Sequence, residues 1–418
     1  EHYKNRIGVF SESSPCETLY SGEHYRGLAQ FLRRTPPGPP TTTNTADSPS
    51  FVVTHLLNSN NNPGNNTTST PNERISRHSW VSFDDLVEDW GSLTGNRITF
   101  LRGYPSPDWL CQLGNKLNVD YEFLHQHFSN MSQLSAAENY CFPPLSITST
   151  DTIQLTFTSI GQWDNYESRI GLGAARAAFG KGMKSFVEDV NGGRLNLCDS
   201  VVRDFELHDL HHFSVEQTVS IRLLPDKDFW TILVWTDCGT SLSRTHRGPW
   251  RQIESQHSSQ TRFLPVPLHY SNSSVKWLAE ASKRRNNNKN TSSQSQQQQK
   301  NLNLLSTDGD LIQTLSFLPL DFGTTIDRRT AATDPFYALD EIFRLFAASE
   351  HQFLNLMAEK LRHWAGENTT TTKLDLVSDE IRNRIVEIQT IKRLIDRHLD
   401  RLHDVLEVVQ ARGGGPSW

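Results

Sequence analysis

A heptad repeat of apolar residues near the end of the chain constrains the fold more than any other feature. The repeat covers about 34 residues, which as an α-helix would extend roughly 50 Å. A helix that carries such a stripe must bury it against a partner. We therefore predict a helical seam formed by Ile381, Ile385, Ile388, Ile395, Leu399, Leu402, Leu406 and Val409. The remaining seam position holds the polar residue Lys392.

The segment before the repeat supplies the simplest partner for this helix. Residues 334–364 carry apolar side chains at helical spacing, and Pro335 suits the first turn of a helix. The polar stretch "AGENTTTTK" separates the two segments. We predict that residues 334–411 form a long antiparallel helical hairpin, and that residues 412–418 turn the chain out of it.

Two other segments have compositions that oppose folding. Residues 35–78 consist mostly of Pro, Thr, Asn and Ser, and residues from about 252 to 300 are rich in Ser, Asn and Gln. Such segments bury too little apolar surface to offset the entropy of ordering. We predict a disordered linker and a disordered insertion, with the apolar stretch "FLPVPLHY" as a candidate exception. For residues 1–34 the sequence predicts no defined structure.

Residues 79–330 mix strand and helix signals. Residues 83–90 have apolar side chains at helical spacing, and residues 97–103 and 152–160 have the pattern of strands. Ser106 and Pro107 are typical of a helix start. Two β-rich runs flank the turn-forming "PDKD" and predict a hairpin. The predicted fold class is α/β of the α+β kind, a mixed sheet covered by helices and followed by the long helical hairpin.

Few residues point to chemistry. The stretch "ELHDLHH" contains His208, His211 and His212, which favour either a polar turn or, less well, part of a zinc site that lacks a second ligand pair. The stretch "GLGAARAAFGKG" lacks the spacing of a phosphate-binding loop and favours an Ala-rich helix. No nucleophile or metalloprotease motif occurs. We assign no catalytic or cofactor-binding residues and predict that the chain is not an enzyme; a hydrolase with an unrecognised site stays an alternative.

The net charge, the cysteines and the lengths of the apolar runs each argue against one class of protein. The net charge of −6 does not favour nucleic acid as a partner. The five cysteines are scattered and do not form a disulfide framework. No apolar run approaches the roughly 18 residues of a membrane-spanning helix.

The order of these elements resembles the cytosolic part of the CorA-like magnesium transporters, and most closely their divergent fungal members. The resemblance rests on a strand, then "PSPDWLCQLGNKLNVDYEFLHQHF", then "TIQLTFTSI", a hairpin and a long helical pair. The stretch "DPFYALDEIFRLFAASEHQFLNLMAEKL" looks like the first arm helix of that family, and "IKRLIDRHLDRLHDVLEVV" looks like the second.

This resemblance implies the cytosolic regulatory region of a membrane protein that transports Mg²⁺ or another divalent cation. It implies a homo-oligomer, a pentamer, in which bound cation at acidic subunit interfaces holds a pore closed. The stalk and membrane helices, with the family's Gly-Met-Asn motif, would follow Trp418. The resemblance assigns no metal-binding residues within this chain. The alternative is a soluble helical-hairpin scaffold or protein-interaction module without transport activity.

Overall fold

The computed structural model describes residues 2–12, 22–34, 49–57, 75–129, 152–163, 171–225, 229–250, 261–268, 311–366 and 377–413. The strands are β1 Val52–Leu57, β2 Ser76–Trp80, β3 Asn96–Arg102, β4 Thr152–Trp163, β5 Asp204–Leu207, β6 His212–Pro225, β7 Trp230–Thr236 and β8 Thr261–Phe263. The larger helices are α1 His2–Glu12, α2 Arg26–Leu32, α3 Phe83–Trp90, α4 Pro107–Lys116, α5 Tyr121–Ser129, α7 Leu172–Asn191, α13 Asp340–Gly366 and α14 Val377–Gly413. Shorter turns of helix are η1 Glu23–Tyr25, η4 Thr314–Phe317, α11 Leu318–Asp321, α12 Arg328–Thr333 and η5 Tyr337–Leu339.

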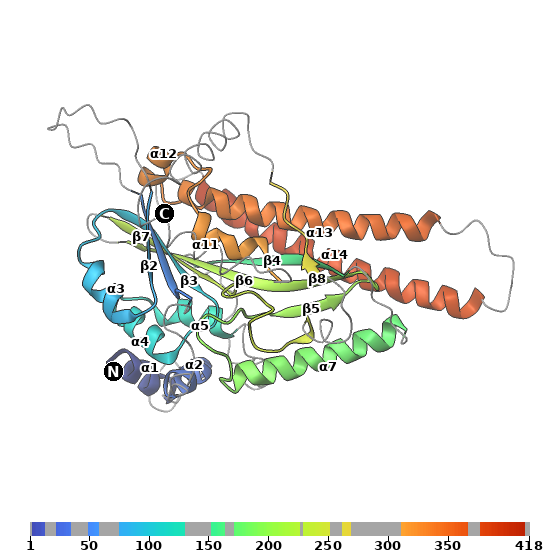
Figure 1. Cartoon of the computed structure of the whole chain (residues 1–418), viewed down its shortest axis with the longest axis horizontal. Helices are drawn as coiled ribbons and strands as arrows, with labels where there is room; N and C mark the ends of the chain where they lie inside the picture. Colours follow the sequence, from blue (N-terminus) through green and yellow to red (C-terminus); the bar gives the residue numbers. More distant parts are fainter. Residues whose placement is uncertain are drawn as a thin grey trace, which may run out of the picture.

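The strands form one mixed sheet. Its order is β2-β1-β3-β7-β6-β4-β8, and β5 pairs with β6 beside this path. Strands β3 and β7 are parallel, and all the other pairs are antiparallel. Helices α1, α2, α4, α5 and α7 lie on one side of the sheet, and α11, α13 and α14 lie on the other (Figure 1). The predicted fold class, a mixed sheet with helices followed by a long helical hairpin, is confirmed.

The two faces of the sheet belong to two separate cores because side chains alternate along each strand. In β3, Ile98 and Phe100 join the core under α11–α13, whereas Leu101 joins the core under the N-terminal helices. In β7, Val234 and Trp235 divide in the same way. A strand that is apolar on both faces must be covered twice, which explains the helical layer on each side.

Several elements form where local sequence signals predict them. Ser106 caps α4, its Oγ accepting the backbone N–H of Trp109 at 3.2 Å. Asp120 does the same for α5 by accepting the N–H of Glu122 at 3.0 Å. Residues 171–182 lie at the start of the regular helix α7, as predicted for the Ala-rich stretch. Caps of this kind depend on neighbouring residues alone, which is why the sequence locates these helices well.

The predicted boundaries of the first 78 residues are wrong. Residues 2–12 and 26–32 are helices whose side chains Ile7 and Phe31 are buried in the core. Residues 52–57, inside the predicted linker, form β1, an internal strand that is buried along its whole length. Averaging over a Pro-, Asn- and Thr-rich segment conceals the short apolar run "FVVTHLL". Most of the rest of the predicted linker lies outside the described residues.

The predicted insertion at residues 252–300 is also interrupted. Strand β8 lies within it and pairs antiparallel with the end of β4, Phe263 standing opposite Gly161. Its last residue, Phe263, is the first residue of the apolar stretch "FLPVPLHY", and residues 264–268 follow without regular secondary structure. The residues around it, 251–260 and 269–310, lie outside the described part of the chain.

Helices α13 and α14 form the predicted antiparallel hairpin and run along one face of the sheet (Figure 1). Their own core consists of Phe353 and Met357 from α13 packed against Ile391 and Leu394 from α14. The larger residue numbers on α13 thus meet the smaller ones on α14. The hairpin places one side of α14 against the strands and leaves another side facing outward.

Candidate functional site: the charged face of the long C-terminal helix

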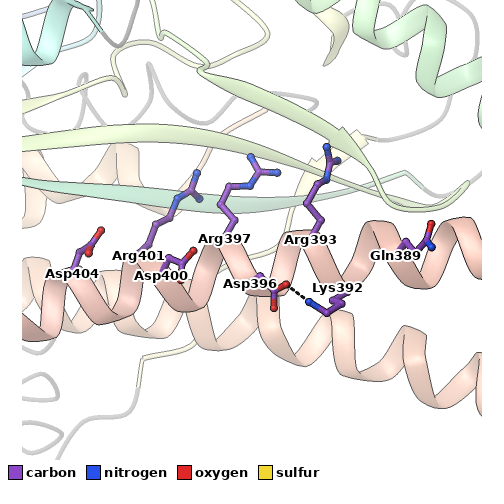
Figure 2. Close-up of a pocket in the computed structure, with 8 residues that line it drawn as sticks. All are labelled: Gln389, Lys392, Arg393, Asp396, Arg397, Asp400, Arg401 and Asp404. Atoms are coloured by element: carbon purple, nitrogen blue, oxygen red, sulfur yellow. Dashed lines mark hydrogen bonds and ion pairs between the residues drawn. The ribbon is translucent and has the colours of Figure 1, made fainter. Parts of the chain in front are cut away.

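Three arginines spaced four residues apart on α14 face an acidic patch on the sheet. This arginine row consists of Arg393, Arg397 and Arg401, and its partners are Asp204 and Glu206 on β5 and Glu216 on β6. Residues at i, i+4 and i+8 share one face of a helix. Figure 2 shows the three side chains pointing from α14 toward the strands. The row therefore holds the helix against the sheet by charge as well as by apolar packing.

The contacts of the row become more buried along the helix. Arg393 Nη2 lies 3.3 Å from Glu206, and the arginine side chain is 67% exposed. Arg397 Nη1 lies 2.8 Å from Asp204. Arg401 donates two hydrogen bonds to Glu216, at 2.6 and 3.0 Å, and this glutamate side chain is only 7% exposed.

Glu216 is the most buried acid of this patch. Burial alone would raise its pKa, but the hydrogen bonds from Arg401 and the charges of Arg401 and Arg397 outweigh burial and lower the pKa. Glu206 behaves in the opposite way, because burial and the charge of Asp204 raise its pKa more than the arginines lower it. Arg401 therefore supplies both arginine hydrogen bonds to the Glu216 carboxylate, and Arg397, 3.6 Å away, contributes to the compensation of its charge.

Removing Arg401 should destabilise the protein more than removing Arg393. We expect Arg401→Met to cost about 3 kcal/mol, because it leaves Glu216 buried without its two donors. Arg393→Met, at the exposed end of the row, should cost about 0.5 kcal/mol. Urea-induced unfolding of both variants measures the difference, and equal costs would contradict the burial gradient.

A buried pair joins the two helices of the hairpin. His398 Nδ1 on α14 lies 2.5 Å from Glu350 Oε2 on α13, and both side chains are 1% exposed. The His398 ring stacks on Phe353 with a centroid distance of 3.9 Å and an interplanar angle of 18°. His398 Nε2 also lies 3.9 Å from Glu216. Sheet, α13 and α14 meet at this point.

The outer side of α14 carries a second charged row. We call Asp396, Asp400 and Asp404 the carboxylate row; all three are exposed and lie one helical turn apart. Lys392 Nζ donates to Asp396 at 2.5 Å. The charged residues of both rows, with Gln389 and Lys392, line an open groove of about 590 Å³ along the helix (Figure 2).

The predicted helical seam is only partly buried. Ile385, Ile388, Leu399 and Leu406 are 49%, 47%, 51% and 51% exposed, so their predicted burial in the hairpin is wrong. These four residues are called the outer stripe below. Ile395, Leu402 and Val409 are half-buried, and the side chain of Ile381 lies outside the described residues.

The helix is rotated relative to the prediction because its contact surface includes polar residues. The fully buried positions are Ile391, Leu394 and His398, and Arg401 follows them on the same side. A seam chosen from apolar residues alone cannot include a histidine or an arginine. The helix has two neighbours, α13 and the sheet, and the charged partners on the sheet decide which side turns inward.

The three histidines of "ELHDLHH" do not converge on one point. His208 is buried, and its Nε2 lies 2.9 Å from Ser214 Oγ. Asp209 accepts the backbone N–H groups of His211 and His212 at 2.6 and 2.7 Å and pairs with Lys360. These contacts are those of a polar turn, the interpretation that the sequence favoured. Among the described residues, no group of three His, Cys, Asp or Glu side chains is placed to hold a metal ion.

A buried Ser–His–Asp arrangement lies elsewhere, beneath the sheet. His127 Nδ1 on α5 lies 2.8 Å from Ser220 Oγ on β6, and His127 Nε2 lies 3.3 Å from Asp237 Oδ1. These residue types form the catalytic triad of many hydrolases. Here all three are fully buried, and Trp235 stacks on the histidine ring at 4.1 Å. Because Ser220 is enclosed in the sheet, a substrate has no approach to it, and the group acts in packing.

Sequence reasoning missed this arrangement because His127 lies 93 residues before Ser220 and the three residues share no spacing pattern. It also missed the acidic partners of the arginine row, which lie on β5 and β6, almost 200 residues before α14. The available signal was the presence of acids within strand-like sequence, Asp204 and Glu206 in "DFEL" and Glu216 in "HFSVEQ".

In the part of the chain that the structure describes, no helix is both long enough and apolar enough to cross a membrane. Comparison with protein families, with curated proteins and with solved structures finds no match to this chain.

Proposed function

We propose that this chain is the cytosolic regulatory domain of a CorA-like divalent-cation transporter, with Mg²⁺ as the sensed and transported ion. The observation that supports the proposal is the arrangement of α13 and α14, a long antiparallel pair that lies on one face of a helix-covered mixed sheet. The resemblance in sequence implies this combination, and the membrane association of the whole protein belongs to the same proposal.

The carboxylate row provides the electrostatics that such a domain needs. Asp396, Asp400 and Asp404 repeat along the exposed side of α14 at a spacing of about 6 Å. In a homo-oligomer, which by the resemblance is a pentamer, such rows at an interface repel one another. A hydrated Mg²⁺ ion between subunits offsets this repulsion, since Mg²⁺ prefers carboxylate oxygens and retains several of its waters. Loss of the cation would then favour the separated, open arrangement.

Helix α14 is long and is attached to the rest of the domain, so it is suited to connect the domain to other parts of the protein. Its 37 residues extend about 55 Å. The arginine row and the His398–Glu350 pair bind the middle of this helix, residues 393–401, to the sheet and to α13.

Magnesium should stabilise the chain through the carboxylate row. We expect 10 mM MgCl₂ to raise Tm by about 2 °C, as for a ligand with a Kd near 1 mM. The variant Asp396→Asn/Asp400→Asn/Asp404→Asn should lose this increase. Thermal unfolding followed by circular dichroism measures both, with NaCl of equal ionic strength as the control. A Tm that does not respond to millimolar Mg²⁺ would contradict cation sensing by this chain.

The coding sequence offers an independent test. The proposal expects the reading frame to continue beyond Trp418 into two apolar runs of about 20 residues, with Gly-Met-Asn at the end of the first. A stop codon directly after Trp418 would reject the transporter and favour a helical-hairpin scaffold.

A further inference from the structure

We infer that strand β5 couples the two sides of the sheet, so that the ion pairs of α14 on one side control the opening of α7 on the other. Figure 1 shows the two helices on opposite sides of the strands. The connection consists of β5 and the side chain of Arg176 on α7. It lies within one chain and requires neither a divalent cation nor a second copy. The outer stripe takes no part in it.

The side chains of β5 alternate between the two sides of the sheet. Asp204 and Glu206 face α14, where the arginine row pairs with them. Phe205 and Leu207 join the core on the other side, where the Phe205 ring lies 5.4 Å from the ring of Phe179 on α7. The strand has four residues and, among the described strands, pairs with β6 alone. Its position therefore depends on the contacts of both its faces.

The pairing of β5 with β6 depends on the arginines of α14. Asp204 stands directly opposite Glu216 in the ladder, and Glu206 lies two residues further along the same face of β5. Carboxylates at such neighbouring positions repel one another and weaken a strand pair. The guanidinium of Arg397 compensates all three acids. Its nitrogens lie 2.8 Å from Asp204, 3.6 Å from Glu216 and 3.8 Å from Glu206. Without Arg397 this short ladder should open more often.

Arg176 ties the end of β5 to both helices. Its Nε donates to the backbone carbonyl of Leu207 at 2.8 Å, and its Nη2 donates to that of His208 at 3.2 Å. The same Nη2 donates to Glu387 Oε2 on α14 at 2.8 Å, and Nη1 pairs with the other oxygen of this carboxylate. Both charged side chains are partly buried, so water screens the pair incompletely. One guanidinium thus connects α7, the end of β5 and α14.

These contacts make α14, β5 and the first half of α7, residues 172–181, one cooperative unit. When α14 releases β5, the strand loses its ring contact with Phe179 and its hydrogen bond from Arg176 together. The second half of α7 is held by a different contact, because the Phe186 ring lies 5.0 Å from that of Trp250. Segments that open together exchange their backbone amide hydrogens together. The two halves of α7 should therefore respond differently to a change on α14.

Hydrogen exchange of the full chain, followed by mass spectrometry with EDTA present, tests the inference. In Arg397→Gln the amides of residues 172–181 should exchange at least about fivefold faster than in the parent chain, because β5 is released on the other side of the sheet. Residues 184–191 should keep their exchange rate. The matched control is Arg344→Gln, since Arg344 and Asp340 form an ion pair of similar exposure within α13. This control should leave both halves of α7 unchanged.

Three outcomes overturn the inference. If Arg397→Gln leaves the exchange of residues 172–181 unchanged, the two sides of the sheet are not coupled. If Arg344→Gln accelerates it equally, the loss of any ion pair has this effect. If exchange increases uniformly in Arg397→Gln, with β3 and the second half of α7 included, the chain opens globally and not through a unit of α14, β5 and the first half of α7.

A second pair of variants tests whether β5 carries the coupling from α7 to α14. Arg176→Met and Glu387→Gln each remove the ion pair between the two helices, but only Arg176→Met also releases the end of β5. Because coupling is reciprocal, Arg176→Met should accelerate the exchange of residues 393–401 at least about threefold more than Glu387→Gln does. Equal effects would assign the coupling to the ion pair and overturn the role of β5. No divalent cation takes part, so either result leaves the magnesium test unaffected.

Discussion

The free energy of unfolding should fall by about 4 kcal/mol per pH unit as the pH decreases from about 6 to 4.5. Four histidines that are buried in the neutral form cause this dependence: His55, His125, His127 and His208, each at most 7% exposed. Burial lowers the pKa of His55, His125 and His127 to about 4, and that of His208 to about 3.

The free energy of unfolding falls with decreasing pH because the unfolded chain binds more protons than the folded chain. Histidine in the unfolded chain has a pKa near 6.5. Below this pH the four histidines bind protons in the unfolded chain but stay neutral in the folded chain. Stability is therefore complete above pH 6.5 and declines until the folded-state pKa values are reached. Two groups act in the opposite direction. Burial raises the pKa of Asp199 to about 6, and burial with the charge of Asp204 raises the pKa of Glu206. The folded chain gains at most one proton at each of these two groups, so the uptake of four protons by the unfolded chain still leaves a net loss of stability.

Urea-induced unfolding between pH 7.5 and 4.5 measures this slope. His208→Gln, which keeps a hydrogen-bonding group beside Ser214, should reduce the slope by about 1.4 kcal/mol per pH unit. His403→Asn is the control, because His403 is 70% exposed and should leave the slope unchanged. If the slope measured for the parent chain is no larger than the value expected for one histidine, about 1.4 kcal/mol per pH unit, these buried rings are protonated in the folded state.

The success of the sequence predictions depends on how local their cause is. Helix α4 was located through Ser106 and Pro107, which act on their immediate neighbours. Strands β6 and β7 were located through the turn between them. In contrast, β1 needs only six residues because β2 and β3 flank it, and its surroundings in sequence resemble a linker. Tertiary neighbours decide whether such a short segment is ordered.

In the candidate site, too, the features with a local cause were predicted and those that depend on distant residues were not. The sequence correctly predicted a long helix with a regular apolar stripe and a helical partner. The orientation of that helix depends on Asp204 and Glu216, which are distant in sequence and attract arginines that an apolar count ignores. The error is informative, because residues that were expected to lie inside the hairpin are the ones that α14 presents outward.

The second large effect is expected at Asp237, which is fully buried directly after β7. Arg203 donates to its two carboxylate oxygens at 2.6 and 2.7 Å, and the backbone N–H of Thr218 donates at 2.6 Å. Burial alone would raise the pKa of Asp237, but the charge of Arg203 and the hydrogen bond from His127 outweigh it and lower the pKa. The carboxylate thus connects β6, α5 and the residues before β5.

Asp237→Asn should reduce the free energy of unfolding by about 3–5 kcal/mol, because it leaves the charge of Arg203 without compensation in the interior. Asp396→Asn is the matched control, since Asp396 also pairs with a cation but is 53% exposed, and its loss should cost less than about 1 kcal/mol. Urea-induced unfolding at pH 7.5, where the histidines are neutral in both states, separates this effect from the acid dependence.

A double variant distinguishes a lost attraction from an uncompensated charge. If the cost of Asp237→Asn comes from the remaining guanidinium, then Arg203→Met/Asp237→Asn should be more stable than Asp237→Asn alone, although it has lost one more native group. If the attraction itself supplied the stability, the double variant would be no better than the single one. The first result is expected because Arg203 is 9% exposed and water reaches it poorly. The pair would then be a structure in which each charge is tolerated only because the other is present.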